Sequence, residues 1–169
     1  MEEDPLIVEL YYDVLDLQSM VFSSMESEIY LLLPSKVKET LSTILTKSEN
    51  ILKGKTIRKE NILWARMVMM LKVLIMMKEH YIPKYFERYY KLWEDENTKE
   101  VLEDIGLIKE DLTEEIKEEI ISNLEKIISL ISHVIMEEEY DFNRIKNYTD
   151  KYFGSAIKIL LSRGEKVMF

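Results

Sequence analysis

Residues 62–77 read ILWARMVMMLKVLIMM, and the predicted fold is built around them. Only Arg66 and Lys72 interrupt its apolar side chains. A helix that is apolar on nearly every side is normally buried at the centre of a protein. The membrane alternative is weaker, because 16 residues with two cations fall short of a span. The stretch therefore predicts a central helix, from about Arg58 to His80, that other helices surround.

Amphipathic stripes before this stretch supply two of the surrounding helices. Apolar residues recur at spacings of four and three over residues 6–29, directly after Asp4 and Pro5, which suit the start of a helix. Pro34 stops this stripe because proline cannot continue the helical ladder. Ser35 is placed to cap a second helix, which runs from there to about Leu52.

An aromatic segment follows Pro83, where we expect a break or kink. Residues 84–93 hold five aromatic side chains, and their helical spacing puts four of them on one broad face. Such a face belongs either to the core or to a protein interface, where Tyr and Trp are enriched. We assign the five to a partner interface: Tyr85, Phe86, Tyr89, Tyr90 and Trp93.

The remaining pattern predicts a short helix and a long one. Residues 94–111 form an acidic connection with a short helix over Thr98–Ile105 that Gly106 ends. Asp111 with Glu114 resembles a capping box for a last long helix of about 25 residues. The fold class is thus all-α, a multi-helix bundle with a small C-terminal appendage. We place the bundle domain at 1–139 and the appendage at 140–169.

The appendage differs in charge and composition from the bundle. Residues 142–169 hold six basic and two acidic side chains, a net charge of +4 in a chain of net charge −9, so residues 1–141 carry −13. Their aromatic content is compatible with strands, and we expect a short helix from Ser155 to Gly164 and a terminal strand at 167–169. The appendage is either a small module or an extension docked on the bundle. We add four of its residues to the partner interface: Tyr152, Phe153, Arg163 and Phe169.

The composition leaves little room for catalysis. The chain has no Cys and four Gly, which excludes thiolate chemistry and leaves almost nothing for a phosphate-cradling loop. His80 and His133 stand outside any metal-ligand spacing, because neither has a carboxylate three residues earlier. We therefore expect no enzyme activity, no cofactor and no metal. The start of the chain is acidic where a secretion signal is basic, so we expect the cytoplasm.

Basic residues also gather in the loop around Gly54. The candidates for phosphate contact there are Lys53, Lys55, Arg58 and Lys59. The alternative is that these cations are ordinary surface residues or pair with the protein's own acids, and the net charge of −9 favours that alternative.

One family resemblance rests on the order of these segments and on short motifs. Leu33-Pro34-Ser35-Lys36-Val37 follows the first helix, Asn61-Ile62-Leu63-Trp64-Ala65-Arg66 enters the central one, and Leu112-Thr113-Glu114-Glu115 opens the last long one. The chain then ends in residues 156–166, AIKILLSRGEK. This order resembles archaeal GINS subunits of the type with the helical domain first. That family carries a small β-rich domain of about 50 residues, so with some 30 residues after Glu139 that domain would be shortened or absent.

The resemblance implies a non-catalytic scaffold subunit that helps to hold the replicative helicase and a nuclease-like partner together, in a hetero-oligomer and away from membranes. A high charged fraction (33%) without Cys is also typical of heat-loving organisms. The alternative function is a small helical subunit of an RNA-guided defence complex, or a viral helical protein, that contacts nucleic acid through the basic residues.

Overall fold

The protein is described by a computed structural model that covers residues 3–27, 30–111, 113–137 and 141–167. Over these ranges the chain is all-α, as expected, and contains no strand. The helices are α1 (Pro5–Glu26), α2 (Pro34–Leu52), α3 (Ile62–Met76), α4 (Ile82–Glu94), α5 (Glu96–Asp104), α6 (Glu114–Met136) and α7 (Phe142–Ser162). A π-helical turn, η1 (Met77–Tyr81), joins α3 to α4, and a 3-10 turn, η2 (Lys109–Asp111), precedes α6.

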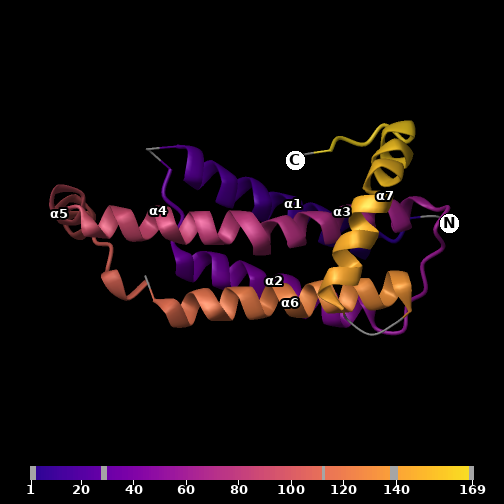
Figure 1. Cartoon of the computed structure of the whole chain (residues 1–169), viewed down its shortest axis with the longest axis horizontal. Coiled ribbons are helices and arrows are strands. Elements are labelled where there is room, and N and C mark those ends of the chain that lie inside the picture. The colour runs from indigo at the N-terminus through magenta and orange to yellow at the C-terminus, as the bar shows by residue number, and fades with distance from the viewer. Residues whose placement is uncertain (1–2, 28–29, 112, 138–140, 168–169) are drawn as a thin grey trace.

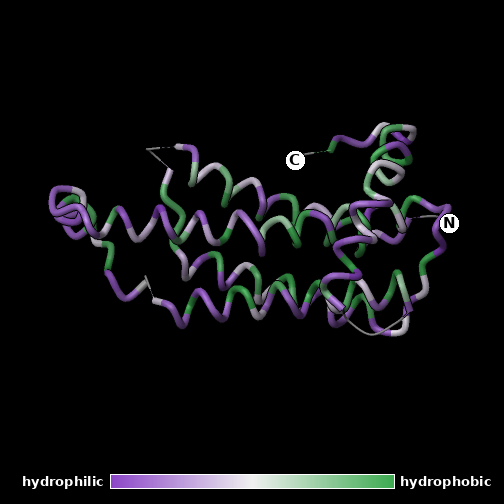
Figure 2. The backbone as a smooth tube through the Cα atoms, in the orientation of Figure 1, coloured by the Kyte–Doolittle hydropathy of each residue, from purple (hydrophilic) through white to green (hydrophobic). Residues whose placement is uncertain are grey.

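The helix α3 lies at the centre of the bundle, as its sequence predicts. It packs against α1, α6 and α7, while α2 packs against α1 and α6 (Figure 1). Four of the five methionines at positions 67–77 are fully buried, and Met76 is half-buried, so the methionines fill the core. Figure 2 shows α6 alternating between hydrophilic and hydrophobic residues along its length, as expected for a helix with one face in the core.

The helices α3 and α4 form one long rod, because the expected break at Pro83 is absorbed within η1 (Figure 1). The N–H of Ile82 donates to the carbonyl of Met77, five residues back. This wider turn comes just before Pro83, which has no N–H and would otherwise interrupt the ladder. The rod therefore continues past the proline.

Side-chain caps fix the starts of several helices. The Asp4 carboxylate accepts from the N–H of Leu6 at 2.9 Å, which confirms the predicted start of α1. The helix α3 starts at Ile62, four residues later than expected, because Asn61 caps it. Thr113, and not the predicted Asp111, caps α6, since its Oγ1 accepts an N–H at 3.1 Å.

The prediction for Pro34 and Ser35 is wrong in detail. The helix α1 ends at Glu26, well before the proline, and Pro34 occupies the first turn of α2. Proline fits there because its missing N–H would have no intrahelical partner. Ser35 lies inside the helix, and no side chain caps its start.

The tail differs most from the sequence prediction. Residues 142–162 form a single helix, α7, where we expected strand-like character and a short helix. Its buried positions, Ile145, Thr149, Ala156 and Leu160, follow helical spacing and pack α7 across α3 (Figure 1). The predicted domain boundary at 139/140 and the last two residues of the predicted terminal strand lie outside the described residues.

The aromatic segment belongs to the core, which corrects its assignment to a partner interface. Tyr85, Phe86, Tyr89 and Trp93 are all buried, whereas the fifth residue, Tyr90, is half-buried and its hydroxyl donates to Glu114 at 2.9 Å. The hydroxyl of Tyr85 donates to the carbonyl of Leu32, and Tyr89 and Trp93 form a second apolar cluster with α5. These side chains are covered because α5 and the segment before α2 fold against this end of α4.

We predict that Trp93→Ala destabilises the chain by about 3–5 kcal/mol, because the substitution leaves a cavity in this cluster. Urea unfolding followed by circular dichroism measures the change. Val101→Ala is the matched control, since Val101 is 58% exposed on α5 and should cost no more than about 0.5 kcal/mol. An unchanged unfolding midpoint for Trp93→Ala would contradict the core assignment.

Candidate functional site

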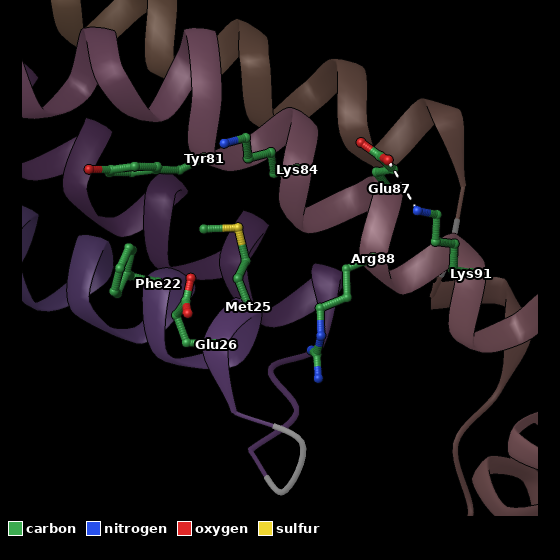
Figure 3. A pocket seen from close by; sticks show the side chains of 8 residues that line it. All are labelled: Phe22, Met25, Glu26, Tyr81, Lys84, Glu87, Arg88 and Lys91. Carbon is green, nitrogen blue, oxygen red and sulfur yellow. Dashed lines mark ion pairs between the residues drawn. The ribbon is translucent and has the colours of Figure 1, made fainter.

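One open groove lies between the end of α1 and the start of α4, and we call it the α1–α4 groove. Its volume is about 440 Å³. Figure 3 shows its lining: Phe22, Met25 and Glu26 from α1, Tyr81 from η1, and Lys84, Glu87, Arg88 and Lys91 from α4.

The floor of the α1–α4 groove is apolar and its rim is charged. The ring of Phe22 is 47% exposed and meets Tyr81 edge to face, with 6.0 Å between ring centroids. Glu26 stands on the α1 side, and Lys84 stands on the α4 side. Neither makes an ion pair with any residue in the described part of the chain. An apolar floor with a polar rim is the usual anatomy of a protein-binding surface.

Arg88 fixes the geometry of this groove. Its guanidinium donates to the carbonyls of Ser24 and Ser27, the latter at 2.8 Å, and so ties α4 to the end of α1. The carbonyls at a helix end have no intrahelical partners, and a cation there is favourable. Arg88 is therefore a structural residue, and the spacing of the two walls does not depend on a ligand.

A second cavity, of about 410 Å³, lies where the end of α6 meets α7, and we call it the α6–α7 pocket. Its lining comes from three segments: Lys59 from the loop before α3, Ile135 and Met136 from α6, and Arg144, Asn147, Tyr148, Lys151 and Tyr152 from α7. Among the described residues, the lining thus includes three cations and no carboxylate.

Aromatic rings organise the α6–α7 pocket. The ammonium groups of Lys59 and Lys151 lie 5.4 Å and 5.3 Å from the centroid of the Tyr152 ring. The ring of Tyr148 lies tilted against that of Tyr152, with centroids 4.6 Å apart, and the Tyr148 hydroxyl accepts from Trp64 Nε1 at 3.1 Å. Burial raises the pKa of the Tyr148 hydroxyl above its usual value.

The structure separates the four predicted phosphate-contact residues. Lys59 lines the α6–α7 pocket, whereas Lys55 forms an ion pair with Asp4. Lys53 and Arg58 are exposed in the same loop. Of the predicted interface residues in the tail, Tyr152 and Phe153 are half-buried, Arg163 is exposed, and Phe169 lies outside the described residues.

The buried charge of the protein is Arg66 in the middle of α3, which is 1% exposed. Its guanidinium forms an ion pair with Glu165, beyond the end of α7, and a longer contact with Glu3 at 3.4 Å. The hydroxyl of Tyr12 donates to the second oxygen of Glu165 at 2.6 Å. This hydrogen bond, before all other causes, raises the pKa of Tyr12. The cluster joins both ends of the chain to the central helix.

Neither the α1–α4 groove nor the Arg66 cluster follows from the sequence predictions above. Phe22 lies off the apolar stripe of α1, and an aromatic residue on the polar side of a helix is the signal that could have revealed the groove. The partner of Arg66 is 99 residues away in sequence, and no local pattern indicates it.

Comparisons of the chain with protein-family models, curated proteins and solved structures found no match. The resemblance to GINS subunits therefore stays a prediction. Within the described residues, no cluster of His, Asp or Glu has the geometry of a metal site. None of the described helices is long and apolar enough to cross a membrane.

We predict that Tyr11→Phe weakens the alkaline loss of stability. Burial raises the pKa of Tyr11 to about 12, so the folded state retains its proton between pH 10 and 12 while the unfolded state loses it. Stability from this group is complete below pH 10 and is lost as the pH rises to about 12. The slope of unfolding free energy against pH should become shallower by up to about 1.4 kcal/mol per pH unit in the variant.

The same variant should be at least as stable as the wild type at pH 7. The Tyr11 hydroxyl is buried and has no hydrogen-bond partner among the described residues, so its removal abolishes a desolvation cost. Urea unfolding at several pH values measures both effects. An identical pH slope in the two proteins would refute the first, and a loss at pH 7 would refute the second.

We predict that Glu165→Gln destabilises the chain by about 3 kcal/mol, because it removes the main partner of a buried cation. Glu3→Gln is the control and should cost less than about 1 kcal/mol, since Glu3 is exposed and more distant from Arg66. Adding Arg66→Met to Glu165→Gln should recover most of the loss. Thermal and urea unfolding of the four proteins measures these differences, and equal losses in both glutamine variants would contradict the assignment.

Proposed function

We propose that this chain is a non-catalytic scaffold subunit of a multiprotein assembly, a GINS-like subunit that supports the replicative helicase in the cytoplasm of a heat-loving archaeon. The observation that carries the scaffold part is the α1–α4 groove, with an aromatic floor beside charges of both signs that form no ion pair within the described residues. The segment order and motifs that resemble GINS subunits support the replication part.

The occupant that fits the α1–α4 groove is an amphipathic helix of another subunit. The walls of the groove are two helices, and their lining residues repeat at three- and four-residue steps, such as Phe22 and Glu26 on α1 or Lys84 and Arg88 on α4. A third helix packs into such a groove by placing its own apolar ridge between the two rows.

The charges of the rim specify the orientation of that helix. Glu26 on the α1 side attracts a basic residue, and Lys84 on the α4 side attracts an acidic one. Glu87 and Lys91 already pair with each other at 3.3 Å, so they add little to this preference. The partner helix should therefore carry opposite charges on the two flanks of its apolar stripe.

We predict that Phe22→Asp abolishes co-purification of the other subunits. A charge in the floor of the groove would be buried without a partner when the third helix docks. The tagged chain is recovered from extracts of its own organism, the co-purified proteins are identified by mass spectrometry, and the stoichiometry is read from the native mass.

Val101→Asp is the matched control, because Val101 is also exposed and lies on α5, outside the groove. The expected result is a defined hetero-oligomer for the wild type and for Val101→Asp, and the chain alone for Phe22→Asp. Recovery of the wild-type chain only as a monomer would overturn the scaffold proposal. A stoichiometric assembly without helicase or replication proteins would overturn its replication part.

A further inference from the structure

The α6–α7 pocket concentrates positive charge in a protein of net charge −9. Lys59 and Lys151 share the ring of Tyr152, and Arg144 lines the same cavity. The attraction between each cation and the ring holds both ammonium groups beside Tyr152. None of the lining residues that the structure describes is a carboxylate, so this lining is complementary to an anion.

The carboxylates in the first half of α7 are engaged elsewhere. Asp150 forms an ion pair with Lys72 of α3. Asp141 accepts from the backbone N–H of Arg144 at 3.3 Å and caps the helix. Asp150 is thus paired with α3, and Asp141 is bonded to the first turn of the α7 backbone.

Exposed cations continue beyond the pocket along α7. Along α7, Arg144, Lys151 and Lys158 recur every seven residues and are exposed, so they form a stripe about 21 Å long on one face of the helix. In the loop before α3, Lys53 and Arg58 are exposed near Lys59 in sequence. A stripe of this length matches a chain of phosphates better than a single small anion.

We infer that the α6–α7 pocket and the cation stripe of α7 bind the sugar–phosphate backbone of a single-stranded nucleic acid. The lysines and Arg144 contact phosphates, and Asn147 offers an amide for hydrogen bonds to the strand. Met136 and Tyr148 give the floor an apolar and aromatic character that suits an unstacked base. A duplex keeps its bases stacked and cannot use such a floor. This binding goes beyond the proposed scaffold role and uses other residues.

The test is fluorescence anisotropy of the full chain with labelled single-stranded DNA and RNA of about 20 nucleotides. Lys59→Gln with Lys151→Gln should weaken binding by about tenfold or more at low salt. The slope of log affinity against log salt should fall by about 1.4, since each phosphate contact on a single strand contributes about 0.7. The two oligonucleotides distinguish RNA from DNA as the source of the backbone.

The matched control is Lys109→Gln with Lys126→Gln, which changes the net charge equally at exposed positions outside the pocket. It should bind like the wild type. Tyr152→Leu should weaken binding severalfold while Tyr152→Phe retains it, because only the ring is needed to gather the two lysines. Circular dichroism melts confirm that the compared variants fold.

Four results would overturn the inference. They are no binding by the wild type at about 50 mM salt, equal loss in the control pair, duplex bound as tightly as single strands, and a mononucleotide bound as tightly as the oligonucleotide. Binding of acidic vesicles or a phosphopeptide in place of the oligonucleotides would assign the pocket to those ligands and also overturn it. The scaffold proposal depends on Phe22 and the α1–α4 groove, which shares no lining residue with the α6–α7 pocket, so either proposal can fail without the other.

Discussion

Burial of α3 on all sides is the constraint on which the rest of the structure depends. Twelve of its fifteen residues are buried, so helices must cover it from every direction. The helices α1 and α6 cover part of its surface, and α7 crosses over what remains. Without α7, the side chains of α3 that now pack near Ile145 and Leu160 would be exposed to water. Burial of the apolar surface of α3 therefore requires α7.

That arrangement also explains how a charged residue is tolerated in the central helix. Arg66 would be costly in the core without a partner. Because α7 crosses α3, the chain beyond the end of α7 brings Glu165 to the guanidinium, while the first half of α1 brings Tyr12 to the same carboxylate. The ion pair costs desolvation and adds little net stability, but it makes the positions of the two chain ends depend on each other.

The sequence predicts the local structure well and the coverage of surfaces poorly. The start of α1 after Asp4 follows from capping chemistry, and the burial of α3 follows from its hydropathy. Both signals are local in the sequence. Whether the aromatic side chains of α4 are buried depends on α5, and the sequence of α5 does not indicate which surface it packs against. The aromatic residues of α7 have strand propensity, yet Ile145, Thr149 and their successors keep a helical spacing that packing against α3 enforces.

The sequence pattern alone does not predict that the cations of the α6–α7 pocket come together. Lys59 belongs to the basic loop around Gly54, and Lys151 belongs to the basic tail at residues 142–169. Each of these two sets of cations, taken alone, is an ordinary surface feature in an acidic protein. Folding places both lysines on one ring.

At physiological ionic strength, charges farther apart than about 8 Å are largely screened, so the acids of α5 and the start of α6 weaken the potential of the pocket very little. The same acids repel phosphates over the rest of the surface. An acidic protein with one basic, aromatic-lined corner is thus better suited to hold a strand in one place than a uniformly basic protein, which would bind it everywhere.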